Sequence, residues 1–324
     1  MDMTGIDTPS TSLAHLPLAL FSVPMGVGGL GLAWREAGRG LGAPTLVGEG
    51  LLLAAGLLWV LLATLHVSRL ARHPAALVAD LRHPIRSAFA GAVTIGMMII
   101  AGGLIPHARG AAETIWLVAV IGHVSIAAWT MRGLLRAPRE AATLTPPLLI
   151  PLVGNVLAPI FGAKLGYEAL SWMLFGLGTL LWAMLQPILL ARLVTGPALP
   201  QRLHPTIVIL LAPPAVGALA LAALTGGWGP VPLSAFGLAV FIAVVMILMV
   251  GDFARVPFAM SWWGWTFPTA AFAVAAQSVA SAHSAPWQTP LLWLVLIVAT
   301  AIVAVVAGAT LRAAAAGHLL RPEG

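Results

Sequence analysis

Polar side chains that could do chemistry are rare inside the apolar runs of this sequence. They are His66, His123, Asn155 and Gln186, with Glu49, Lys164, Glu168 and Asp252 near the ends of runs. Such a group within a membrane indicates a proton relay or an ion path by default. For two of them we expect structural roles instead. His123 should hydrogen-bond to a neighbouring helix, and Asn155 should satisfy a carbonyl that is freed near Pro151.

Enzymatic chemistry finds no support in the residue pattern. The chain has no cysteine, which excludes thiol catalysis and thiolate metal sites. Neither Gly-x-Ser-x-Gly nor His-Glu-x-x-His occurs. The serines considered as nucleophiles have no evident base at helical spacing; they are Ser125, Ser171, Ser261 and Ser278. We therefore expect no catalytic residue, no metal and no cofactor.

One aromatic stretch stands out, SWWGWTFPTA at 261–270. Tryptophans in membrane proteins commonly anchor or pack near the interface. We assign that structural role to Trp262, Trp263 and Trp265. Phe267 is followed directly by Pro268, and a proline inside a span bends its helix.

Composition places the stretch in a membrane. Of the 324 residues, 60% are hydrophobic and 8% charged, and the mean hydropathy is +0.99. Runs of about 20 apolar residues recur, each long enough to cross the hydrocarbon. The first 12 residues lack the basic start of a secretory signal, so we expect the first span to be retained. The net charge of +6 comes from arginines scattered over short loops, which set topology rather than bind nucleic acid.

The runs predict ten helices in one domain of five helical hairpins. The expected spans are 14–34, 46–70, 84–105, 113–135, 145–164, 167–193, 205–225, 232–251, 258–281 and 288–314. We expect a channel domain over 14–316 between short cytoplasmic tails at 1–13 and 317–324. Loops after the even spans, with the C-terminus, hold 12 of the 16 Lys and Arg residues. The positive-inside rule then places both termini in the cytoplasm.

Odd and even spans differ in their prolines. Each odd span opens near a proline, and four of the five carry a second one inside. We expect kinks at Pro24, Pro151, Pro213 and Pro268, and only Pro187 interrupts an even span. Five kinked helices inside a ring of five straighter ones would enclose a narrow central channel.

Six stretches carry a family resemblance, and they occur in order along nearly the whole chain. They are FSVPMGVGGLGLAWR (21–35), RHPAALVADLRHP (72–84), LIPLVGN (149–155), LQPILLARL (185–193), LLAPPAV (210–216) and FAMSWWGWTFP (258–268). Together they resemble the tellurite-resistance/dicarboxylate transporter family, which includes the bacterial TehA proteins and the slow-type anion channels of plant guard cells.

The resemblance implies an all-α membrane protein with ten helices in quasi-five-fold arrangement around a central pore. The odd helices line the pore, the even helices surround them, and the assembly is a homotrimer in the bacterial inner membrane. It also implies a phenylalanine plug, which falls on Phe267, and passage of small anions such as chloride and nitrate. If the ninth helix begins near Arg255, Phe267 lies about 18 Å along it, close to the bilayer centre.

Departures from the family pattern mark further residues. Thr94 stands where the third helix usually has a proline, so bending there must come from a glycine, Gly91 or Gly96, or not occur. Ala19 and Ser22 replace glycines that are common in the family, and Gln186 replaces a glutamate. The candidate pore-lining residues are Ala19, Ser22, Gly26, Gly91 and Thr94.

Three functions compete at this point. The first is a gated anion channel, whose uncharged pore would favour weakly hydrated anions and pass nitrate at least as well as chloride. The second is a proton-coupled secondary transporter or exporter of tellurite or C4-dicarboxylates, for which a pair of mid-membrane cations would be expected; none is present. The third is a relative whose pore is permanently shut.

Overall fold

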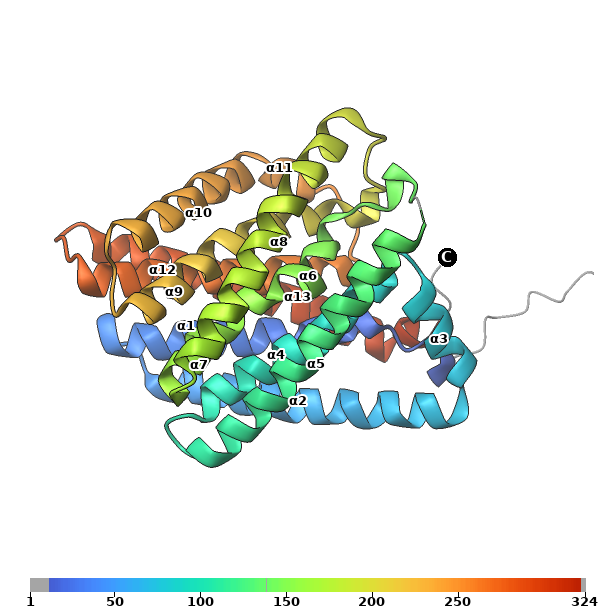
Figure 1. Ribbon diagram of the computed structural model, residues 1–324, viewed down its shortest axis with the longest axis horizontal. Helices are drawn as coiled ribbons and strands as arrows, with labels where there is room; N and C mark the ends of the chain where they lie inside the picture. Colours follow the sequence, from blue (N-terminus) through green and yellow to red (C-terminus); the bar gives the residue numbers. More distant parts are fainter. Residues whose placement is uncertain (1–11, 138, 322–324) are drawn as a thin grey trace, which may run out of the picture.

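The structure is a computed structural model that describes residues 12–137 and 139–321, and no strand occurs among them. The chain folds into a bundle of helices, in which α5 and α8 are inclined to α1 and α2 (Figure 1). The α-helices are α1 (Ser22–Gly40), α2 (Thr45–Arg72), α3 (Pro74–Arg82), α4 (Ala90–Leu104), α5 (Arg109–Arg136), α6 (Leu149–Val153), α7 (Ala158–Leu165), α8 (Glu168–Thr195), α9 (Ala212–Thr225), α10 (Pro230–Leu248), α11 (Val250–Phe253), α12 (Thr266–Ala282) and α13 (Gln288–Ala315).

Short 3-10 helices precede or interrupt the α-helices of the odd spans. They are η2 (Leu18–Phe21), η3 (Arg86–Phe89), η5 (Pro146–Leu148), η6 (Gly154–Leu157), η7 (Gln201–Leu211) and η8 (Met260–Trp265). Three others lie outside the spans: η1 (Leu13–His15), η4 (Ala141–Thr143) and η9 (His318–Leu320).

All ten expected spans are present. In the described residues, nine helices are long and apolar enough to cross a membrane. The tenth is the continuous run of η8 and α12, residues 260–282, in which tryptophans, Pro268 and Gln277 dilute the hydropathy. The largest boundary difference is at the first span. It continues to Gly40 because Arg35 is buried in an ion pair rather than marking the end of the helix.

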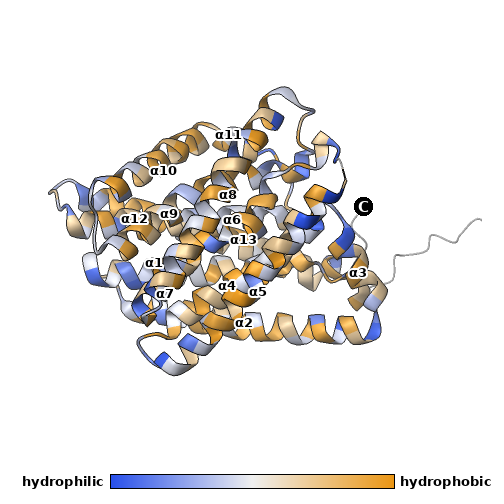
Figure 2. Ribbon diagram, viewed as in Figure 1, coloured by the Kyte–Doolittle hydropathy of each residue, from blue (hydrophilic) through white to orange (hydrophobic). Residues whose placement is uncertain are grey.

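Odd and even spans differ sharply in burial. Between 67% and 83% of the apolar window is buried in the first, third, fifth and seventh spans, against 17–33% in the even spans. The even helices therefore turn large apolar side chains outward, where lipid replaces a protein neighbour. Figure 2 shows hydrophobic colour along the helix lengths, with hydrophilic residues gathered toward the helix ends.

The five odd spans form a closed ring. Helix α1 contacts α4, α4 contacts α6 and α7, α7 contacts α9, α9 contacts α12, and α12 returns to α1. The expected inner ring with an outer ring of even helices is thus the observed fold.

Every odd span changes from 3-10 to α-helix as it leaves the end of the bundle that carries both described chain ends. The prolines expected to kink the helices lie at this change. Pro24 and Pro268 are in the first turn of α1 and α12, and Pro213 is in the first turn of α9. A proline in a first turn leaves no carbonyl unpaired, because its missing N–H would have had no partner there. Each of these prolines is thus the second or third residue of its α-helix, directly after the change, and a kink at each of them stays a prediction.

Pro151 is likewise the third residue of its α-helix, but that helix, α6, is short and ends at Val153, where a second 3-10 segment follows. The third span makes the same change at Phe89–Ala90 without any proline. Gly91 then permits close packing, since a Cβ on it would lie 2.8 Å from the Cα of Pro151.

The chain ends meet at one end of the bundle. The Ser12 N–H donates to the Leu320 carbonyl at 3.0 Å. Of the tail expected at 1–13, only Ser12 and Leu13 are described, and the domain boundaries at 14–316 remain a prediction.

Candidate functional site

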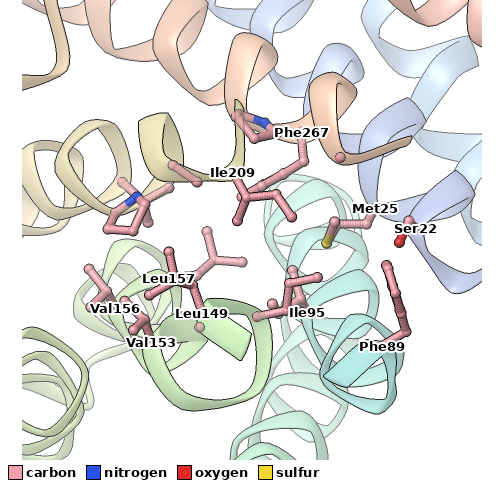
Figure 3. A pocket seen from close by; sticks show the side chains of 17 residues that line it. Ser22, Met25, Phe89, Ile95, Leu149, Val153, Val156, Leu157, Ile209 and Phe267 are labelled. Carbon is pink, nitrogen blue, oxygen red and sulfur yellow. The ribbon is translucent and has the colours of Figure 1, made fainter. Parts of the chain in front are cut away.

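A small cavity lies inside the ring, and all five odd spans line it. Its volume is about 60 Å³. Figure 3 shows Phe267 on one side of the cavity and Leu149, Val153 and Leu157 opposite it. Ile95 and Phe89 line a third side. Ser22 supplies the one hydroxyl among the lining side chains, and none of them is charged. We call this space the central cavity.

A second cavity continues toward the end of the bundle opposite the chain ends. It has a volume of about 140 Å³ and is lined by Gly29, Arg35, Arg39 and Lys164 among others. Phe267, Leu157 and Val216 line both this opposite-end vestibule and the central cavity. The ring of Phe267 therefore stands in the wall between two spaces on one axis.

A third, larger cavity opens at the end that carries the chain ends. Its volume is about 450 Å³, and Phe89 lines both this termini-end vestibule and the central cavity. Ala19 and residues of both described chain ends line it, together with Asp80 and four arginines: Arg69, Arg86, Arg202 and Arg321. The three cavities follow one another through the ring, with a phenylalanine at each junction.

Phe267 is held closely by the helix beside it. Its side chain is buried, and a Cβ on Gly29 of α1 would lie 3.1 Å from its Cδ2 atom. The absence of a side chain at Gly29 thus leaves room for the ring. Pro268 and Pro213 also line the central cavity, each in the first helical turn that follows a 3-10 segment.

Three of the five residues considered as pore-lining, Gly26, Gly91 and Thr94, line none of the three cavities described above, so their place on a pore stays a prediction. A Cβ on Gly26 would lie 2.1 Å from Thr266 Oγ1, so Gly26 lies at the contact of α1 with α12. Gly91 faces the backbone of Pro151, and Thr94 hydrogen-bonds to His123 of α5. These small residues serve helix packing, and a sequence alone gives the two roles the same appearance. Ser22 lines the central cavity and Ala19 the termini-end vestibule.

Several lining residues escaped the sequence analysis, above all Phe89. The others include Met25, Leu157, Ile209 and Val216. A signal for Phe89 existed, because it lies at the start of its α-helix much as Phe267 does. The interior prolines of the odd spans could not point to Phe89, because the third span has no proline inside.

Some of the intramembrane polar residues have local partners, whereas Asn155, Ser171 and Gln277 have none for their buried side-chain atoms. Thr94 Oγ1 and His123 Nδ1 are 2.7 Å apart, as expected of a bond between neighbouring helices. Gln186 accepts a hydrogen bond from Trp182 at 3.0 Å. The expectation for Asn155 is wrong: its side chain is fully buried, and neither amide atom has a partner. Its backbone carbonyl accepts from the Ala158 N–H at the end of η6.

The tryptophans of 261–270 have the structural role expected of them. Trp263 Nε1 donates to Thr310 Oγ1 of α13 at 2.9 Å. Trp265 packs edge-on against Phe253, with ring centroids 4.9 Å apart. They fix η8 against the outer helices and thereby position Phe267 two residues further on.

Arginines at both ends of the row of cavities are anchored by carboxylates. Arg35 donates to both Glu49 oxygens, at 2.8 and 2.7 Å, and to the Gly103 carbonyl at 3.0 Å. Arg69 pairs with Asp80 at 2.6 Å, and Arg86 shares that carboxylate at 2.8 Å. Within the described ranges Lys164 has no hydrogen bond or ion pair of its side chain.

Two groups in the loops have shifted pKa values. Burial, followed by the nearby charge of Arg86, lowers the pKa of His83. The His83 ring is therefore neutral at pH 7, and Nδ1 accepts from the Ile85 and Arg86 N–H groups. At the other end, the hydrogen bond that Tyr167 donates to Glu113 raises the pKa of the tyrosine.

No constellation for catalysis appears in the described residues. No group of three or more metal-ligating side chains exists there. The hydroxyls of Ser125 and Ser261 bond to backbone carbonyls, Ser278 accepts from Trp228, and Ser171 has no partner.

The fold defines a multi-pass membrane protein with a row of cavities along the axis of its inner ring. The family model of the SLAC1 voltage-dependent anion channels matches residues 15–313. The chain belongs to this family, which confirms the resemblance found in the sequence. The family is one of channels and transporters, so membership supports anion transport.

Individual relatives are distant in sequence. The S-type anion channel SLAH3 of Arabidopsis thaliana is 25% identical over 274 residues, which cover 81% of this chain and 43% of the relative. The tellurite resistance protein TehA homolog of Haemophilus influenzae is 26% identical over 200 residues, 61% of each chain. The guard cell S-type anion channel SLAC1 of Arabidopsis thaliana is 26% identical over 185 residues, 57% of this chain and 33% of the relative. The chain thus spans about half or less of the plant relatives' length.

Proposed function

We propose that the protein is a gated anion channel that conducts small monovalent anions, chloride and nitrate, along the axis of the inner ring. Phe267 is the gate. The observation that carries this proposal is its position in the wall between the central cavity and the opposite-end vestibule. Removal of the ring would join these two spaces.

The lining favours weakly hydrated anions. The central cavity offers a passing ion a single hydroxyl, that of Ser22, and no fixed charge. An anion must therefore shed much of its water there, and the cost is lower for nitrate than for chloride. Weak binding also lets the ion leave again, which conduction requires.

The two vestibules supply the preference for negative charge. Four arginines and a single carboxylate line the wide one, while Arg35, Arg39 and Lys164 line the narrow one beside Glu36. Such charges raise the local anion concentration within about a Debye length, ~8 Å at physiological salt. They act at the pore mouths and leave the middle free of trapping charge.

Placement in the cell follows from the arginine bias. Both chain ends are cytoplasmic, which makes the termini-end vestibule the inner mouth. The membrane is the bacterial inner membrane, and three copies of the chain assemble as a homotrimer with one pore in each subunit.

The test is anion current from membranes that contain wild-type protein or Phe267→Ala, measured in chloride and in nitrate. We expect a small wild-type current that rises at least tenfold in the variant, with nitrate at least as permeant as chloride. A matched control is Phe272→Ala, since Phe272 lies on the same helix but stacks on Phe236 of α10, with centroids 5.6 Å apart. Its current should stay at the wild-type level.

Two results would overturn the proposal. If neither protein conducts while a proton gradient drives saturable uptake or export of tellurite or a C4-dicarboxylate, the protein is a coupled carrier. If Phe267→Ala and wild type conduct nothing and carry nothing, the pore is permanently shut.

A further inference from the structure

A fourth cavity lies apart from the conduction axis and shares no lining residue with the other three. Its volume is about 190 Å³, and it lies where the end of α3, η3 and η5 meet the last turns of α5. Ser87 and Leu148 line it, whereas Phe89 and Leu149 of the same 3-10 segments and their continuations face the central cavity. The fourth cavity is therefore on the outer side of the inner ring, at the end that carries the chain ends.

Positive charge dominates its wall. Four arginines line it: Arg82, Arg132, Arg136 and Arg139. In the part of the chain that the structure describes, none of their side chains has an ion pair or a hydrogen bond. Arg132 and Arg136 are four residues apart on α5 and so project from one face of that helix. Four unpaired guanidinium groups around one small space repel each other unless an anion neutralises them.

A buried hydroxyl in the same cavity also indicates an anionic ligand. Thr130 also lines this cavity, its side chain is 8% exposed, and its Oγ1 has no hydrogen-bond partner. A buried hydroxyl without a partner is costly, and a phosphate oxygen could accept from it. Guanidinium groups bind phosphate through two parallel N–H donors, which makes arginine the preferred residue for that group.

The surroundings indicate a lipid rather than a soluble anion. Helix α5 belongs to the outer ring, and its exposed apolar side chains continue to the last turn, with Ile121 67% and Leu135 80% exposed. Trp129, 39% exposed, lines the cavity itself. An exposed tryptophan beside arginines at the end of a span is typical of the headgroup level of a bilayer. Basic pockets between helices at that level bind anionic headgroups.

We propose that this cavity binds the phosphodiester headgroup of an anionic phospholipid. Arg132 and Arg136 hold the phosphate from α5, Arg82 approaches it from the end of α3 and Arg139 from the loop after α5, and Thr130 donates its hydroxyl. The acyl chains lie along the exposed apolar face of α5. The bound lipid ties the end of this outer helix to the inner ring at η3 and η5.

The experiment is native mass spectrometry of the full chain in detergent, titrated with phosphatidylglycerol or with phosphatidylcholine. Wild type should retain phosphatidylglycerol at lower concentration than phosphatidylcholine. The variant R132Q/R136Q should lose about fivefold in affinity for each arginine removed, roughly 25-fold in all. Thr130→Val should weaken binding severalfold while it keeps all four charges.

A matched control removes the same charge from the same end of the bundle. Arg255 and Arg312 are exposed and line none of the four cavities, so R255Q/R312Q should bind phosphatidylglycerol as wild type does. A thermal melt accompanies each measurement. Phosphatidylglycerol should raise the melting temperature of wild type and of R255Q/R312Q but not of R132Q/R136Q, provided that all three fold.

Three outcomes would overturn the assignment. One is equal retention of the two lipids by wild type. Another is an equal loss in R132Q/R136Q and R255Q/R312Q, which would show unspecific charge attraction. The third is binding of glycerol phosphate or inorganic phosphate, at matched ionic strength, that displaces phosphatidylglycerol from wild type. That result would make the cavity a site for a soluble phosphate.

Discussion

At the end that carries the chain ends, a vestibule of about 450 Å³ meets the central cavity at Phe89, whereas at the other end a space of about 140 Å³ meets it at Phe267. Both rings are buried, with 7% of Phe89 and 9% of Phe267 exposed. Their surroundings differ. Phe89 borders a wide, arginine-rich vestibule, and Phe267 separates two narrow, mostly apolar spaces. These volumes are the reason why we propose Phe267 rather than Phe89 as the gate.

The ion pair at the wide end is more deeply buried than the ion pair at the narrow end. Arg69 and Asp80 are almost fully buried, with side chains 2% and 7% exposed. Arg35 and Glu49 are 10% and 35% exposed. Arg69 also donates to the Ala14 carbonyl at 3.0 and 2.7 Å, so the wide end is fixed by an arginine that holds η1.

The largest expected effect compares the two phenylalanines directly. Phe267→Ala should raise the anion current at least tenfold, because it joins the two narrow spaces. Phe89→Ala should change the current less than threefold, because the space beside it is already wide. Current per amount of protein in the membrane, at equal voltage and chloride concentration, measures both. Equal increases would mean that the axis is closed at both junctions and would remove the distinction drawn here.

Stability should show the next largest contrast. Asp80→Asn leaves the buried guanidinium of Arg69 without its counter-charge, and breaking such a pair costs about 3–5 kcal/mol. Glu49→Gln breaks a more exposed pair, for which roughly 1 kcal/mol is typical. The midpoint of thermal unfolding in detergent should therefore fall much further for Asp80→Asn. The comparison of the two ends fails if Glu49→Gln is the more damaging change.

A smaller effect should come from the glycine beside the gate. A Cβ on Gly29 would lie 3.1 Å from the Phe267 ring, and overpacking of this kind costs about 1–3 kcal/mol. Gly29→Ala should favour states in which the ring has moved away and so raise the wild-type current severalfold. The same change in Phe267→Ala should have no effect, because the ring is gone. An equal rise in both backgrounds would mean that Gly29→Ala acts on the helix contact and not on the gate.

The sequence was sufficient for the helices but not for the lining of the cavities. Hydropathy and proline positions located all ten spans, since a length of apolar chain and a breaker act locally. Which small residue faces the axis depends on helix rotation, which no local pattern records. Gly26 and Ser22 are four residues apart, yet one contacts Thr266 and the other lines the central cavity. Phe267 was found because the resemblance carried it, and Phe89 had no such support.

The smallest expected effect concerns His83, which hydrogen-bonds to the start of the segment that carries Phe89. His83 Nδ1 accepts from the Ile85 and Arg86 N–H groups at 3.2 and 3.1 Å, and these residues open the segment that carries Phe89. Burial lowers the pKa of His83 below its usual 6.5. The neutral ring therefore stabilises the fold fully above that value, and the contribution is lost as the pH falls through the lowered pKa.

Melting temperature should accordingly fall slightly as the pH is lowered from about 7 to about 5, near and below the usual histidine pKa. His83→Asn keeps a side-chain acceptor that does not titrate, so its melting temperature should vary less over the same range. His204→Asn is the matched control, since His204 lies at the same end and bonds to the Leu199 carbonyl instead. If the melting temperature of His83→Asn depends on pH as that of wild type does, protonation of His83 does not destabilise this segment. Phe89 would then be positioned by the packing of the inner ring alone.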